Sequence, residues 1–132
     1  MESNFEFLTK DELTRQYFTR ATQAELSYVM GIYPGVLTAV RAIAENIARD
    51  VADQKFLKLD DRETFDSILK RLKNGAYIDD YALQLFYDIK NPGNVAAHTL
   101  ENSSKEEALK ALKQLFALTA WFVGAFYDEK ID

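Results

Sequence analysis

The segment Pro34-Gly-Val-Leu-Thr-Ala-Val-Arg-Ala-Ile-Ala-Glu-Asn-Ile-Ala-Arg-Asp-Val-Ala52 decides the fold class. Its apolar side chains recur every three or four residues, which is the period of one buried helix face. These side chains are Val36, Leu37, Val40, Ile43, Ala44, Ile47 and Val51. Pro34 suits the first turn of a helix, because the N–H that proline lacks would have no partner there. We therefore expect a helix over about residues 35–52.

On the N-terminal side of this segment, we expect a helix over about residues 9–30. Thr9 and Glu12 have the spacing of a capping box, in which each side chain accepts a hydrogen bond from the other residue's backbone. The run from Gly31 to Pro34 then ends the helix, because glycine and proline both interrupt helical structure.

Three further helices are predicted downstream. One covers about residues 63–73 and ends at Asn74-Gly75, residue types that tolerate a left-handed C-cap. The next runs from about Asp79 or Asp80 to Lys90, and the last follows a second capping box formed by Ser104 and Glu107. No segment alternates like a strand. The predicted fold is all-α, a single bundle of about five helices in which the last helix is the longest and the most central.

Composition indicates one domain over residues 1–132. The chain is 48% hydrophobic, which is enough apolar surface for a core. It has no cysteine, so disulfides and thiolate metal sites are excluded. We expect a cytoplasmic protein with no signal peptide and no membrane partner, since no run approaches the ~18 uninterrupted apolar residues of a membrane span.

The charge balance argues against an independent nucleic-acid-binding domain. The formal net charge is −5, and 16 Lys and Arg residues are scattered among 21 Asp and Glu residues. Proteins that bind phosphates usually concentrate basic residues in one stripe, because released counterions drive that binding. We expect DNA to bind only weakly or indirectly.

The segment 88–98 is the most unusual part of the chain. Pro92 must stop or kink the preceding helix, and a short helix restarting there would place Lys90, Asn94 and His98 near one face. These three are the candidate catalytic residues. His98 is the only histidine, so it alone has an unperturbed pKa near neutrality. The favoured interpretation is structural, a histidine bonded to a neighbouring helix, because acid–base catalysis and metal binding both require further groups.

Two other pairs leave alternatives open. Arg41 and Glu45 stand four residues apart, and we expect a partly buried ion pair that fixes their helix against segment 88–98. Trp121 and Tyr127 form either an exposed aromatic patch or part of the core, and the core is the commoner outcome. The expected structural motif thus comprises Arg41, Glu45, Gly93, Asn94 and His98, with the small Gly93 allowing another helix to approach.

Several short motifs then appear in a specific order along nearly the whole chain. They are Ser3-Asn-Phe-Glu-Phe-Leu8, Arg41-x-x-x-Glu45, Ile89-Lys-x-x-Gly-Asn-x-Ala-x-His98, Glu107-Ala-Leu-x-Ala-Leu112 and Ala120-Trp-Phe122. This set resembles the N-terminal helical region of the R (restriction and translocation) subunit of type I restriction–modification systems. That region is similar to helical domains of the HEPN superfamily.

The resemblance implies a HEPN-like accessory domain at the start of a longer R subunit, in contact with other subunits or domains and without catalysis of its own. The parent polypeptide would be an ATP-dependent deoxyribonuclease involved in antiphage defence. The ATP and Mg²⁺ sites would lie in later domains, since this chain has no Gly-x-x-x-x-Gly-Lys-Ser/Thr loop and we expect no cofactor here.

The alternative is a free-standing HEPN-like antiphage or toxin–antitoxin component, which would form a homodimer and cleave RNA or neutralise a partner that does. HEPN ribonucleases use arginine and histidine at a shorter spacing. Here Lys90 replaces the arginine, seven residues separate it from His98, and Pro92 is atypical. Lysine also lacks the planar fork of arginine. The accessory domain is therefore the favoured hypothesis.

We predict that His98→Ala lowers the free energy of unfolding by roughly 1–3 kcal/mol, the usual cost of losing a buried hydrogen-bond partner. A denaturant titration of both proteins measures this difference. Unchanged stability together with a lost activity in vivo would contradict the structural interpretation of His98.

Overall fold

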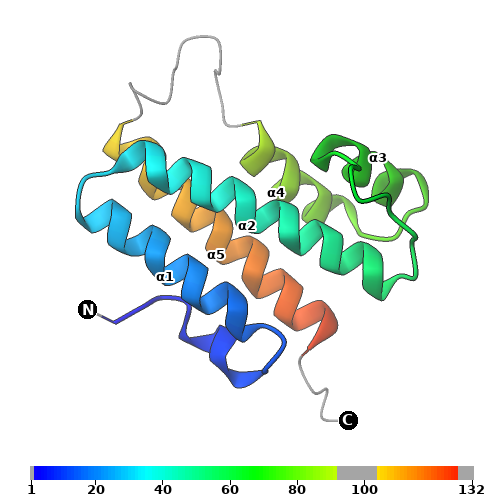
Figure 1. Ribbon diagram of the computed structural model, residues 1–132, viewed down its shortest axis with the longest axis horizontal. Coiled ribbons are helices and arrows are strands. Elements are labelled where there is room, and N and C mark those ends of the chain that lie inside the picture. The colour runs from blue at the N-terminus through cyan, green and yellow to red at the C-terminus, as the bar shows by residue number, and fades with distance from the viewer. Residues whose placement is uncertain (1, 92–103, 128–132) are drawn as a thin grey trace.

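The computed structural model describes residues 2–91 and 104–127, and this part of the chain is helical without any strand (Figure 1). Its elements are a short 3₁₀ helix η1 (Glu6–Lys10) and the helices α1 (Arg15–Val29), α2 (Tyr33–Gln54), α3 (Phe65–Asn74), α4 (Asp80–Lys90) and α5 (Lys105–Phe126). The predicted all-α bundle is confirmed, with five α-helices in the described residues.

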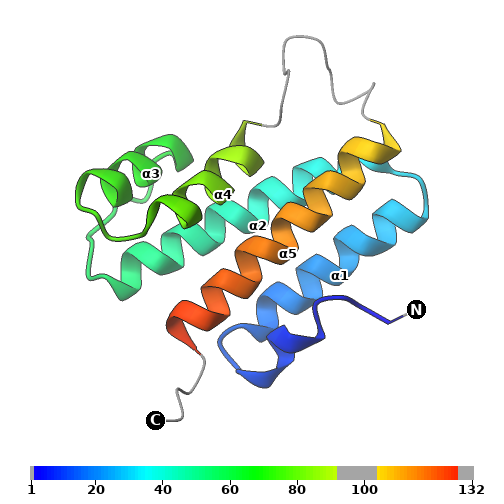
Figure 2. The same ribbon diagram turned by 180° about the vertical axis from the view of Figure 1, so that it is seen from behind.

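Helix α2 lies at the centre of the bundle, since it packs against each of the other four α-helices. Helix α5 packs against α2, α1 and α4 and runs antiparallel to α1, and α3 lies beyond α4 on the side of the bundle away from α1 (Figures 1 and 2). The prediction that the last helix is longest and most central was therefore wrong in part. Helices α2 and α5 both have 22 residues, and α5 does not contact α3 to a comparable extent.

The core is continuous across the bundle and combines large side chains with alanines. Fully buried alanines lie on four helices, among them Ala24 of α1, Ala44 and Ala48 of α2, Ala82 of α4 and Ala108 of α5. Small side chains let helix backbones approach closely, and larger residues fill the remaining space. The bulkiest fully buried side chains are Tyr17, Phe5, Phe86, Phe122, Leu8, Ile43, Ile47, Ile68, Leu69, Leu72, Leu115 and Leu118.

The N-terminus of the first helix differs from the prediction. Thr9 lies in η1, where its hydroxyl donates to the backbone carbonyl of Glu6, so Thr9 and Glu12 form no capping box. Helix α1 begins only after Thr14, whose buried hydroxyl donates to the Leu8 carbonyl at 2.6 Å. The reason is burial: Leu8 lies in the core, so the chain must turn before α1 can start.

The other predicted helix starts agree with the structure to within about two residues. Ser104 and Glu107 form the expected capping box at α5, and the Asp79 carboxylate accepts the Ala82 N–H at the start of α4. Helix α2 starts slightly earlier than predicted, at Tyr33, with Pro34 in its first turn. The proline fits there because the first N–H groups of a helix lack helical partners.

The left-handed residue after α3 is not the one that the sequence predicts. Gly75 has φ −88°, while Ala76 has φ 53°. The glycine is required for a different reason, because a Cβ there would lie 2.1 Å from the Tyr77 ring. Two other helix ends also use a left-handed residue, Gly31 after α1 and Phe56 after α2. An L-residue with a side chain adopts this conformation at a cost of about 1–2 kcal/mol.

Helix α5 is long and apolar enough to cross a membrane, a property shared by core helices of globular proteins. In this bundle it packs against α1, α2 and α4. Trp121 contacts the rings of Phe86 and Phe126, and the Tyr127 hydroxyl accepts a hydrogen bond from Gln54. Of the two alternatives for Trp121 and Tyr127, packing against the core is confirmed.

We predict that Leu115→Ala lowers the free energy of unfolding by roughly 2–5 kcal/mol, because Leu115 is fully buried and the change leaves a cavity. The same substitution at Leu109, also on α5 but 38% exposed, should cost about 1 kcal/mol. Urea denaturation followed by circular dichroism compares them. Equal losses would contradict the described packing of α5.

Candidate functional site

Three of the predicted site residues line one polar cleft of about 450 Å³ between α2, the start of α3 and the end of α4. They are Arg41, Glu45 and Lys90. The cleft is also lined by Arg49, Arg62, Glu63, Thr64, Phe65 and Asp66. Gly93, Asn94 and His98 lie outside the residues that the structure describes.

Arg41 joins α2 to the end of α4. Its Nη1 donates a hydrogen bond to the Lys90 backbone oxygen at 2.6 Å, and its guanidinium carbon lies 5.9 Å from the centre of the Phe65 ring. The last carbonyls of a helix lack partners within the helix and carry partial negative charge, so a cation is favourable there. We expected an Arg41–Glu45 pair to fix α2 against segment 88–98, whereas Arg41 makes a contact of this kind without Glu45, at Lys90 in the described part of the segment.

The prediction that Arg41 and Glu45 form an ion pair is wrong. Because Arg41 reaches toward Lys90, Glu45 pairs instead with Arg49, one turn further along α2, at 3.3 Å. Arg49 also donates to the backbone oxygen of Glu63 at 2.5 Å. Arg49 therefore connects α2 to the loop before α3, as Arg41 connects it to α4.

The amino group of Lys90, the candidate catalytic lysine, is oriented toward α3. Its Nζ lies 3.5 Å from an Asp66 oxygen, and the Lys90 side chain is only 14% exposed. Lys70 binds the other Asp66 oxygen at 3.0 Å. The hydrogen bond from Lys70, followed by the charges of Lys70 and Lys90, holds the pKa of Asp66 below its usual value. Asp66 is therefore ionised at neutral pH and remains a partner for both lysines.

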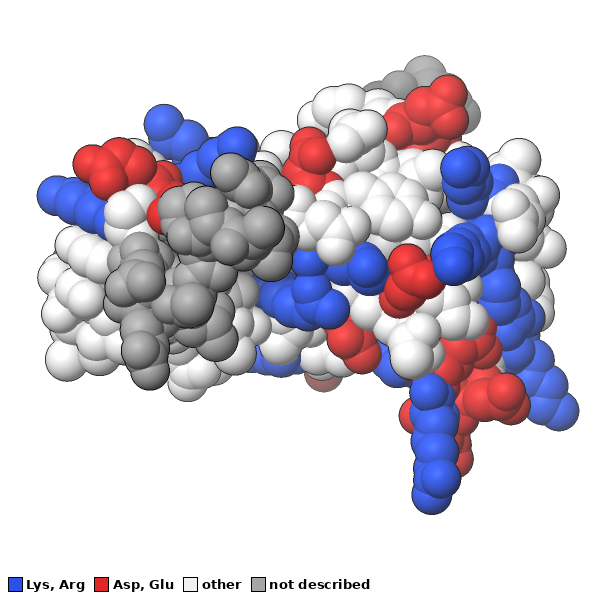
Figure 3. All heavy atoms as spheres, turned by 90° about the horizontal axis from the view of Figure 1, so that it is seen from above, with Lys and Arg blue, Asp and Glu red and all other residues white. Residues whose placement is uncertain are grey.

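Glu63 accepts hydrogen bonds from Ser67 and Arg71 at 3.0 and 2.8 Å. Removal from water favours the neutral acid, but the hydrogen bonds from Ser67 and the Asp60 backbone, with the charge of Arg71, lower the Glu63 pKa overall. Figure 3 shows basic and acidic side chains interleaved on the face of the molecule seen from above. The polar cleft is thus a network in which Arg41, Arg49 and Lys90 each have an acceptor from the protein.

The polar cleft has no grouping of metal ligands in the described residues. In ranges 2–91 and 104–127, no three His, Cys, Asp or Glu side chains are placed so that they could hold a metal ion together. In the described part of the cleft, charged hydrogen bonds hold α2, α3 and α4 against one another. Charged hydrogen bonds are stronger than neutral ones.

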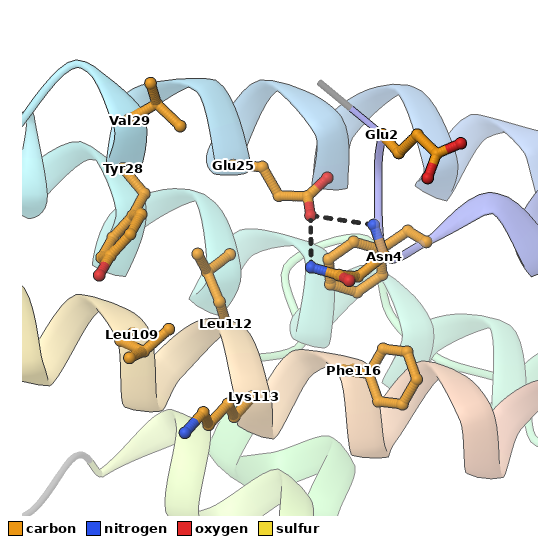
Figure 4. A pocket seen from close by; sticks show the side chains of 10 residues that line it. Glu2, Asn4, Glu25, Tyr28, Val29, Leu109, Leu112, Lys113 and Phe116 are labelled. Carbon is orange, nitrogen blue, oxygen red and sulfur yellow. Dashed lines mark hydrogen bonds between the residues drawn. The ribbon is translucent and has the colours of Figure 1, made fainter.

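A second depression, the α1/α5 groove, was not anticipated from the sequence. It has a volume of about 530 Å³ (Figure 4). Its lining residues are Glu2, Asn4, Phe5, Glu25, Tyr28, Val29, Leu109, Leu112, Lys113 and Phe116. Two apolar residues of α5 that line the groove, Leu109 and Phe116, are 38% and 43% exposed. The sequence feature that could have indicated the groove is that apolar residues occupy more than one face of α5.

Glu25 fixes one wall of the α1/α5 groove. It is only 6% exposed, and its carboxylate accepts hydrogen bonds from the Ser3 hydroxyl at 2.5 Å and from the Asn4 N–H and amide at 3.1 and 3.2 Å. Buried carboxylates require such partners, because an unpaired charge away from water is costly. The bonds hold the N-terminal segment against α1 and place Phe5 in the core.

With both sites described, comparison with known proteins gives one result. The profile of the family described as "Domain of unknown function (DUF4145)" matches residues 22–121. The chain belongs to this family. No curated protein and no solved structure matches the chain. The matched range of the DUF4145 domain includes Arg41, Lys90 and the α5 wall of the groove, and excludes Ser3 and Asn4.

We predict that Arg41→Ala lowers the free energy of unfolding by about 1 kcal/mol, because the Lys90 carbonyl loses its charged donor. Glu45→Ala should cost no more than about 0.5 kcal/mol, as is usual for exposed pairs on a helix. Chemical denaturation of the single and double variants measures the coupling. Since these two residues are not paired, their effects should add; a strongly non-additive double variant would restore the ion-pair prediction.

Proposed function

We propose that this DUF4145 domain is a non-catalytic accessory domain that supplies protein contacts, as part of the R subunit of a type I restriction–modification enzyme. The observation that carries the proposal is the α1/α5 groove, which is lined by the exposed side chains of Val29, Leu109 and Phe116. Exposed apolar side chains that line one groove favour a protein interface, because burying them removes apolar surface from water.

The ordered motifs of the sequence supply the second support, since they resemble the helical N-terminal region of R subunits. The structure gives some of these motifs a packing role. Ser3 and Asn4 bind Glu25, Arg41 binds the end of α4, and Glu107 caps α5. Residues with such roles stabilise a scaffold, which is consistent with an accessory domain.

The polar cleft supports the non-catalytic part of the proposal. A phosphate that bound Lys90 or Arg41 would have to displace Asp66 from Lys90 or the α4 carbonyl from Arg41. Hydrolysis also requires a positioned base and a group that stabilises developing negative charge. Because Arg41, Arg49 and Lys90 already serve the fold, their arrangement favours structural support over catalysis.

Under this proposal, nucleotide hydrolysis, Mg²⁺-dependent cleavage and DNA-sequence recognition belong to other domains or subunits of the complex. The domain would contribute contacts in the cytoplasm, and the net charge of −5 gives no attraction to DNA phosphates.

Two measurements test the proposal. The purified chain, incubated with labelled RNA and with plasmid, with and without Mg²⁺, should leave both intact because catalysis is assigned elsewhere. The methylation and specificity subunits should co-purify with the polypeptide that carries this domain.

RNA cleavage that disappears in a His98→Ala variant would overturn the accessory role and establish the alternative, a HEPN-like ribonuclease of an antiphage or toxin–antitoxin system. Intact RNA without co-purifying restriction subunits would also contradict the proposal.

A further inference from the structure

Phe56 combines two features that do not stabilise this bundle. It directly follows the C-cap of α2 and has φ 60°, in the left-handed region. Its side chain is 95% exposed, the highest value for a large apolar residue in the described part of the chain. A single exposed aromatic ring is common on protein surfaces. A bulky residue in the left-handed region is an outlier, so the two features together point to a role for the ring.

The turn after α2 explains the backbone conformation of Phe56 but not its ring. The Phe56 N–H donates to the Asp53 carbonyl at 3.0 Å, and the Leu57 N–H donates to the Ala52 carbonyl at 2.9 Å. These two bonds form a Schellman motif, which satisfies carbonyl groups at the end of a helix and places one residue in the left-handed region. Glycine is the usual residue at that position, because it has no Cβ.

The end of α1 forms the same motif with the usual residue. The Gly31 N–H donates to the Tyr28 carbonyl at 3.1 Å, and the Ile32 N–H donates to the Ser27 carbonyl at 2.8 Å. Gly31 has φ 78°, a conformation that glycine adopts without steric cost. At the end of α2 the chain therefore carries a side chain where the backbone would be more stable without one.

Packing within the bundle does not account for the Phe56 ring either. The next residue, Leu57, packs against the core and fixes the turn. The Phe56 ring is almost fully exposed, so it buries too little surface to stabilise the described residues. Strained residues are found preferentially at functional sites, where the strain serves binding or catalysis. The contribution of this ring thus lies in a contact outside the bundle.

Phe56 lies at the end of the bundle where α5 ends. The C-terminal ends of α2 and α5 are side by side (Figures 1 and 2). Gln54 donates a hydrogen bond to the Tyr127 hydroxyl at 2.7 Å, and the Lys55 amino nitrogen lies 5.6 Å from the centre of the Phe126 ring. A polypeptide that continues after α5 therefore starts close to Phe56.

We propose that Phe56 anchors this domain to the domain that follows it in the same polypeptide, by inserting its ring into an apolar pocket of that domain. The inference rests on the proposed function, in which the chain is part of a longer R subunit, and it names the partner of one contact. Residues 128–132 span at most about 18 Å when fully extended, so the following domain is held near Phe56. Such a tether makes docking intramolecular and raises the effective concentration, so a contact that depends on one aromatic anchor can form.

Two variants of the 132-residue chain test the premise that the ring does not stabilise the bundle. Phe56→Ala removes the ring and keeps a left-handed Cβ, so the urea midpoint should equal that of the unaltered chain. Phe56→Gly also removes the Cβ and should unfold at a higher urea concentration, because glycine adopts φ 60° without strain. A lower midpoint for either variant, or no gain for Phe56→Gly, would overturn the proposal.

Photo-cross-linking in the full-length polypeptide tests the contact itself. Benzoylphenylalanine is placed at position 56 in one protein and at position 13 in a second. Leu13 is the matched control, because it is 63% exposed and lies in the turn before α1, at the same end of the bundle (Figures 1 and 2). Position 56 should form an intramolecular cross-link to a residue beyond 132, identified by mass spectrometry, with a yield several times that of position 13.

Equal yields at positions 56 and 13 would show proximity through the tether alone and would overturn the anchor. The absence of a cross-link from position 56, or cross-links only to other polypeptides, would overturn it as well. The proposed function is judged separately. Co-purifying methylation and specificity subunits without the cross-link retain the accessory role and remove the anchor. The cross-link without any such subunits retains the anchor and removes the restriction assignment.

Discussion

The packing of α2 against its neighbours is the constraint on which the other features depend. Its buried face has eight residues, with alanines at positions 44, 48 and 52 four residues apart. These small side chains line up along one side of the helix and give neighbouring backbones room to approach. The exposed side of the same helix carries Arg41 and Arg49, which bind the end of α4 and the loop before α3. One helix thus fixes both halves of the bundle, by burial on one side and by charge on the other.

Most of the fold could be predicted because it depends on local chemistry. The apolar period of residues 34–52 and the caps at Asp79 and Ser104 each act within a few residues. The failure at Thr9 has a non-local cause. Its spacing from Glu12 is that of a capping box, but burial of Leu8 bends the chain before a helix can form there. Similarly, Gly75 is required by the ring of Tyr77 rather than by its own backbone conformation.

At the candidate site, too, local interactions could be predicted and non-local ones could not. Spacing alone suggested that Arg41 and Glu45 pair, since residues four apart are neighbours on a helix. The C-terminus of α4 offers Arg41 a partner distant in sequence, and Glu45 turns to Arg49. The α1/α5 groove could be foreseen only in part, because apolar residues on more than one face of α5 do not show which of them a neighbouring helix covers. Phe116 illustrates this, as it packs on Phe5 and Phe7 and yet stays 43% exposed.

The position of Trp121 has a consequence for how this domain can be observed. It is the only tryptophan in the chain, and its indole lies between Phe86 of α4 and Phe126 at the end of α5. Its fluorescence emission therefore reports the contact between α4 and the end of α5, whereas far-ultraviolet ellipticity averages over every helix. Proteins open in separate cooperative units before they unfold completely. A shift in emission at constant ellipticity would show that the packing around Trp121, between α4 and the end of α5, opens before the helices unfold, without any introduced label.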